Sequence, residues 1–169
     1  MKSMIMIMLL VFGLNANAQD GIELAVYQDL KFATIGDSER GYKAGTTDVV
    51  LRLRMMGFQD RYGYTIVFPE YEYADIDGTY KRYGAGVGYV LNQLVIENLE
   101  VDATVSYGFI DRYSKTFFSF GLTSSLNYDL GGLKISAKGQ LTQRNDLKAF
   151  YSESNIWKPS FFIGILIKL

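Results

Sequence analysis

The chain ends in the stretch Phe161-Phe-Ile-Gly-Ile-Leu-Ile-Lys-Leu169, in which every second residue is apolar. Residues two apart in a strand point to the same face, so this alternation predicts a strand with one wholly apolar face and one mixed face. The apolar face carries Phe161, Ile163, Ile165, Ile167 and Leu169. A soluble protein rarely ends on so apolar a segment, because no later chain remains to cover it.

The other end of the chain reads as an export signal. Lys2 precedes an apolar segment, and Ala16-Asn17-Ala18 supplies a cleavage site of small residues. The apolar segment is too short for a membrane-spanning helix. We therefore expect a secretory signal peptide at residues 1–18 and a mature single domain at residues 19–169.

Composition favours strands in the mature domain. The chain has 13 Tyr, 11 Phe and 17 Gly but only 2 Pro, a balance typical of pleated sheets joined by turns. It has no cysteine, so we expect no disulfide. The net charge of −1 gives no basic patch and argues against a nucleic-acid partner. No later apolar run could cross a membrane as a helix, so a membrane location would require a closed barrel.

Alternation with a period of two recurs along the mature domain and predicts eight strands. We expect them at residues 22–35, 48–56, 62–73, 80–91, 99–110, 118–129, 133–144 and 161–169. In the third strand the apolar set shifts near Pro69, which suggests a bulge there. The longest predicted connections, residues 36–47 and 145–159, fall at the same end of an up-and-down barrel, whereas residues 129–132 form a short turn at the other end. The predicted fold class is therefore all-β, an eight-stranded antiparallel up-and-down transmembrane β-barrel.

The residues on the two faces indicate which face lies outside. The less apolar face is rich in Gly, Ser and Thr, which suit the crowded interior of an eight-stranded barrel. The apolar face carries aromatic residues near strand ends, as expected for girdles at the two lipid–water interfaces. These aromatics are Tyr62, Tyr64, Tyr89, Phe109, Phe118 and Tyr128. Together, the two faces place the apolar side in lipid.

Charged strand residues then face the interior, where they must be paired to be tolerated. We expect an ion-pair network that fills the lumen. Its members are Glu23, Arg52, Arg54, Glu100, Asp102, Lys134 and Lys138. The alternative is a charge-lined conduction path, although eight strands leave space only for side chains or one small ligand.

The terminal strand resembles the carboxyl-terminal signal that the outer-membrane assembly machinery recognises, with matching residues at Gly164, Ile167 and Leu169. Phe162 stands where a polar residue is usual, and Leu169 replaces the commoner terminal aromatic residue. Over the mature domain the architecture is similar to the small OmpX- and OmpA-type barrels, and the signal-peptide junction is similar to exported proteins of Bacteroidetes-type bacteria. The resemblance rests on strand count and alternation, so it implies a fold more than a function. It also implies outer-membrane lipid and the assembly machinery as partners.

Catalysis is not expected. Enzymatic barrels of this size class use a histidine, and this chain has none. The nearest substitute is Ser136 with Lys134 or Lys138, which share one face of a strand but suit lumen lining better. No cofactor or metal is expected either. The carboxylates Glu70, Glu72, Asp75 and Asp77 cluster around a predicted loop and could bind calcium weakly, but they lack the spacing of a calcium-binding loop.

The predicted loops offer contacts with the exterior. Phe150, Tyr151 and Trp157 lie among polar residues, as in a loop that binds an extracellular partner of unknown identity, or they pack on the barrel rim. A second loop carries charges that either bridge lipopolysaccharide phosphates or are solvated, at Asp37, Glu39, Arg40 and Lys43. The predicted function is a non-enzymatic outer-membrane barrel with a structural or surface-interaction role. The alternatives are a narrow OmpA-like channel and a secreted soluble barrel that binds a small apolar ligand.

Overall fold

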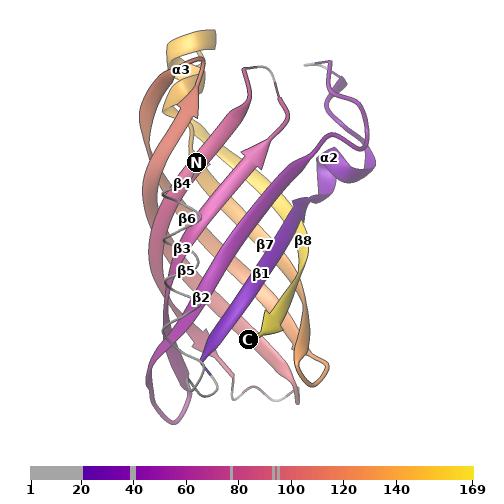
Figure 1. Cartoon of the computed structure of the whole chain (residues 1–169), viewed down its shortest axis with the longest axis vertical. Coiled ribbons are helices and arrows are strands. Elements are labelled where there is room, and N and C mark those ends of the chain that lie inside the picture. The colour runs from indigo at the N-terminus through magenta and orange to yellow at the C-terminus, as the bar shows by residue number, and fades with distance from the viewer. Residues whose placement is uncertain (1–20, 39–40, 77, 93, 95) are drawn as a thin grey trace.

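The chain forms a closed barrel of eight antiparallel strands in sequence order, in which β1 pairs with β8 (Figure 1). This computed structural model describes residues 21–38, 41–76, 78–92, 94 and 96–169. The predicted all-β fold and the strand count are confirmed. The predicted signal peptide, residues 1–18, lies outside the described residues.

Most strands begin and end within a few residues of their predicted bounds. They are β1 (Ile22–Asp29), β2 (Asp48–Gln59), β3 (Gly63–Ala74), β4 (Tyr80–Leu91), β5 (Leu99–Arg112), β6 (Lys115–Asp129), β7 (Leu133–Gln143) and β8 (Trp157–Lys168), with short helices α2 (Leu30–Thr34) and α3 (Asn145–Tyr151). In the described parts of the chain, neither helix has the length and apolarity needed to cross a membrane.

The two ends of the barrel differ. At one end, here called the terminal end, β1 begins, β8 ends and the connections span residues 60–62, 92–98 and 130–132. The opposite end, here called the loop end, carries the long connections with α2 and α3 (Figure 1). The prediction of a strand through residue 35 is wrong, because the Asp29 side chain accepts a hydrogen bond from the Phe32 backbone N–H at 2.9 Å and starts α2.

Side chains alternate between a polar interior and an apolar exterior. In β5, for example, Asp102, Thr104 and Ser106 are buried while Ala103, Val105 and Tyr107 are exposed. The same alternation holds through β6 and β7. The barrel is therefore inverted relative to a soluble protein, whose apolar residues lie inside.

The strand β3 departs from the prediction. Tyr64, Ile66 and Phe68 lie in the interior, not on the outer face, and β3 pairs with β4 without a register shift at Pro69. Room for them comes from β4, whose glycines face them: a Cβ on Gly86 would come within 2.4 Å of the Phe68 ring. The bulge lies instead in β2, between Met56 and Gln59.

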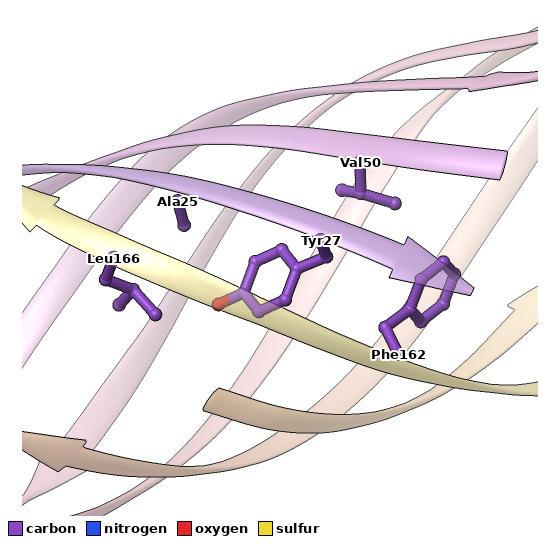
Figure 2. Packing of buried hydrophobic residues seen from close by; sticks show 5 residues of the cluster. All are labelled: Ala25, Tyr27, Val50, Phe162 and Leu166. Carbon is purple, nitrogen blue, oxygen red and sulfur yellow. The ribbon is translucent and has the colours of Figure 1, made fainter. Parts of the chain in front are cut away.

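A small apolar cluster fills the interior where β1, β2 and β8 meet. It consists of Ala25, Tyr27, Val50, Phe162 and Leu166. Figure 2 shows the Tyr27 ring lying against β8 between Leu166 and Phe162. A second cluster comprises Tyr64, Ile66, Phe68 and Val90. These apolar clusters are small. Charged and polar residues occupy much of the remaining interior.

Candidate functional site

Charged side chains near the terminal end form a first buried group, here called the terminal-end cluster: Glu23, Arg54, Glu100, Asp102 and Lys134. Lys134 Nζ lies 2.7 Å from Glu23 Oε1 and 2.7 Å from Glu100 Oε2. Arg54 lies between two carboxylates, 3.3 Å from Glu23 and 3.7 Å from Asp102. The structure thus brings together five of the seven predicted lumen residues.

Polar neighbours extend this cluster across the barrel. Asp102 accepts hydrogen bonds from Ser125 Oγ at 2.7 Å and from Asn127 Nδ2 at 3.0 Å. Ser136 Oγ donates to Asn127 Oδ1 at 2.6 Å. Ser136 therefore belongs to a hydrogen-bond chain that ends at a carboxylate, and no hydrogen bond joins it to a lysine among the described residues. Ser136 therefore lines the lumen and is not paired with Lys134 or Lys138 by a hydrogen bond.

A second group lies between the terminal-end cluster and the loop end. In this central triad, Glu70 accepts hydrogen bonds from both Arg52 and Arg82, with Arg52 Nε at 2.8 Å. Arg82 also donates to Ser119 Oγ at 3.0 Å and to Ser106 Oγ at 2.8 Å. The Arg52 guanidinium lies 4.0 Å from the centre of the Phe68 ring. All charged members are buried.

Two triad members were missed in the sequence. Glu70 and Glu72 lie within the third predicted strand, but they were grouped with Asp75 and Asp77 as carboxylates near a loop. In the structure they point into the barrel from β3. Arg82 was not assigned a role. The sequence does contain a pattern that places these residues inside. Glu70 and Glu72 continue the every-second-residue alternation that begins at Tyr64. Arg82 continues the alternation of the glycines in β4. Within the described residues no group of three or more acidic side chains has the arrangement of a metal site, and Asp77 lies outside them.

Lys138 stands apart from the other predicted lumen residues. Its Nζ lies 4.5 Å from the centre of the Tyr27 ring and 4.4 Å from that of Phe162, an arrangement typical of cation–π contacts. It forms no hydrogen bond with any described residue. The interior therefore divides into separate charged groups and is not one continuous network.

The residues of the predicted assembly signal close the barrel. A Cβ on Gly164 would come within 2.4 Å of both Tyr27 Cδ1 and the Val26 carbonyl oxygen, so only glycine fits here without movement. Ile167 pairs with Leu24 and faces outward. The Leu169 backbone N–H donates to the Ile22 carbonyl at 3.0 Å.

The predicted loop contacts lie on or beside the barrel rim. Phe150 packs edge-on against Tyr113 and Phe117, with ring centres 4.9 and 5.5 Å apart. Trp157 begins β8 and packs edge-on against Phe120. Tyr151 is more exposed, and its hydroxyl accepts a hydrogen bond from Arg112 at 3.1 Å. Phe150 and Trp157 therefore pack on the barrel rim, which was one of the two predicted alternatives.

The other charged loop is only partly described. Asp37 lies 3.1 Å from Lys31 and forms a β-bridge with Tyr42. Lys43 belongs to the same segment, whereas Glu39 and Arg40 lie outside the described residues. Asp37 is therefore engaged within its own loop.

An ion-pair clamp fixes α3 at the loop end. The buried Asp146 binds Arg112 at 3.0 Å and both Nε and Nη2 of Arg144, at 2.9 and 2.8 Å. Burial alone would raise the pKa of Asp146, but the hydrogen bonds and charges of the two arginines outweigh it and hold that pKa below its usual range. The carboxylate therefore stays ionised and ties α3 to β5.

These features define a class: a closed eight-stranded barrel with a charged, filled interior and an apolar outer wall. Comparison with known proteins adds no closer identity, since no protein family, no curated protein and no solved structure matches the chain.

Proposed function

We propose that this protein is an integral outer-membrane barrel that crosses the membrane with its eight strands, is non-enzymatic, and presents its loop end outside the cell for a structural or surface-interaction role. The single observation that carries the proposal is the inverted polarity of the wall. Large apolar side chains are exposed on the strands while arginines and lysines are buried inside. An apolar surface of this extent favours contact with lipid.

Aromatic residues on the outer wall support the same proposal. Tyr71, Tyr83, Phe109 and Phe118 pair side by side across β3 to β6 and form a band near the loop end. Tyr62, Tyr89 and Tyr128 lie toward the terminal end. Two such bands are expected where a barrel meets the lipid headgroups. Tyr64, predicted in these bands, is excluded because it is buried inside.

The two alternatives find less support. A channel requires an open path, but bulky side chains fill the interior, among them Arg52, Arg54 and Arg82. A soluble barrel that binds an apolar ligand requires an apolar lumen, whereas ion pairs occupy this one. The resemblance to OmpX- and OmpA-type barrels agrees with the preferred proposal at the level of fold.

Cell fractionation tests the proposal. We expect the mature protein to sediment with the outer membrane and to stay there after alkaline carbonate washing. The reason is that lipid would cover the apolar outer wall, which is otherwise exposed to water. Protease added to whole cells is expected to cut only within the loop-end connections, such as residues 144–156. Recovery in the soluble periplasmic extract would support the soluble alternative instead.

A further inference from the structure

A cavity of about 580 Å³ opens at the loop end of the barrel. Its buried side is formed by Asp29, Asp48, Glu72 and Tyr80, which extend from the strand ends. Aromatic residues from α2 and the loops line it further, among them Phe32 and Tyr42. The cavity is therefore acidic at its base and aromatic at its sides.

Cations that line the cavity are already engaged by other acids. Lys31 pairs with Asp37, Lys158 with Glu153, and both Arg112 and Arg144 with Asp146. By contrast, no ion pair within the described part of the chain engages Asp29, Asp48 or Glu72. Lys138, Arg82 and Arg144 attract these carboxylates from a greater distance, but Arg82 is bound to Glu70 and Lys138 lies between two rings.

Asp48 is the least satisfied of the three carboxylates. Asp29 accepts the α2 backbone N–H of Phe32, and Glu72 accepts Gln140 Nε2 at 3.2 Å. Asp48 is only 6% exposed, and its Oδ1 has no hydrogen-bond partner among the described residues. The hydroxyl of Tyr80 is likewise buried without one. Buried polar atoms of this kind normally have a partner, so the two point to a missing ligand.

We propose that the loop-end cavity binds a small organic amine in its cationic form. An ammonium group supplies the hydrogen-bond donor that Asp48 Oδ1 lacks and a positive charge for Asp48 and Glu72, which form no ion pair with any described residue. The aromatic sides suit the apolar and cationic parts of such a ligand. A bare metal ion fits less well, because the cavity is large and the carboxylates are not arranged as a metal site. If the loop end lies outside the cell, as in the proposed function, the amine reaches the cavity from the exterior. Binding of the amine itself does not depend on that location.

Calorimetric titration of the folded barrel with 1,4-diaminobutane tests the proposal, with 1,4-butanediol as an uncharged match. We expect saturable binding of the diamine and none of the diol. Glu72→Gln and Asp48→Asn are each expected to weaken binding about tenfold or more, the scale of a lost hydrogen bond to a charged group. The matched control Glu97→Gln removes the same charge from an exposed turn and leaves binding unchanged.

Thermal unfolding without ligand gives a second measurement. Since Asp48→Asn replaces a buried carboxyl group whose Oδ1 has no hydrogen-bond partner among the described residues, its melting temperature should equal or exceed that of the wild type. A clearly lowered melting temperature would show that Asp48 has a structural partner and would overturn the proposal. So would absence of diamine binding, equal loss in Glu97→Gln, or displacement of the diamine by equimolar Mg²⁺. None of these results bears on whether the barrel lies in a membrane.

Discussion

Glu70 is the residue on which two buried arginines depend. Arg52 and Arg82 reach it from strands on either side of β3, and all three side chains are at most 1% exposed. Loss of a single carboxylate would leave two guanidinium groups in the interior without their anion. Breaking a buried pair in this way is far more costly than replacing the whole group with apolar residues.

We therefore expect Glu70→Gln to lower the free energy of unfolding by about 3–5 kcal/mol. Urea unfolding of the barrel in lipid vesicles measures the change. Glu97→Gln, at an exposed position, serves as the matched control and should unfold like the wild type. If the two variants unfolded at the same urea concentration, the triad would not stabilise the barrel.

Gly164 gives a second test at the residue scale. In Gly164→Ala the added methyl group would meet the Tyr27 ring and the Val26 carbonyl where β8 closes on β1. Overpacking of this kind costs about 1–3 kcal/mol. Gly139→Ala in β7 is the control, because its Cβ would find no atom closer than 3.7 Å. Equal unfolding midpoints for the two alanine variants would contradict this account of the closing seam.

Among the elements, α3 is held by an ion-pair clamp in addition to the packing of Leu147 and Phe150. Asp146 binds arginines from β5 and from the segment before α3, and the Arg144 backbone N–H donates to the Ile156 carbonyl at 2.6 Å. The clamp therefore fixes both ends of the connection that leads into β8. Trp157, the only tryptophan of the chain, follows directly.

This clamp should open in acid. The pKa of Asp146 is lower in the folded chain than in the unfolded one, so its contribution to stability is complete above about pH 4 and is lost as the pH falls through the folded value. We expect the fluorescence of Trp157 to shift to longer wavelength in that range. Asp146→Asn should already show the shifted spectrum at neutral pH and no acid step. Identical titration curves for the two proteins would show that the clamp does not govern this connection.

Strands were predictable where the two faces differ in chemistry. In β5, β6 and β7, small polar residues alternate with large apolar ones, so both the strand and its inner face could be inferred. In β3 the alternation was misread, because Tyr64, Ile66 and Phe68 are apolar and yet lie inside. They fit inside because the neighbouring strand β4 has glycines opposite them, and the sequence of β3 alone does not show this. The short helix α2 had only its Asp29 cap as a local signal.

Ion-pair partners were less predictable than the positions of the charges. Alternation alone placed Arg52, Arg54, Lys134 and Lys138 on the inner face. Which acid each one meets depends on the strand register and on the curvature of the barrel, and neither is encoded locally. Thus Arg52 binds Glu70 and not an acid of the terminal-end cluster, and Lys138 packs between aromatic rings.

At the scale of the whole molecule, the outer wall of the barrel carries a band of exposed apolar side chains. Val87 lies within β4, faces outward and is 53% exposed. Val105 and Leu122 face outward on the strands that follow, and they are also exposed. A band of this kind is stable against hydrocarbon and a liability in water.

Quenching of a fluorophore on Val87→Cys, in protein reconstituted into lipid vesicles, tests this central claim most directly. The chain has no cysteine of its own, so the label is specific. Glu97→Cys, on the turn at the terminal end, serves as the water-exposed control. We predict that brominated lipid quenches the Val87 label strongly while aqueous iodide does not, and that the Glu97 label shows the reverse. Strong quenching of the Val87 label by iodide, without quenching by brominated lipid, would contradict the account.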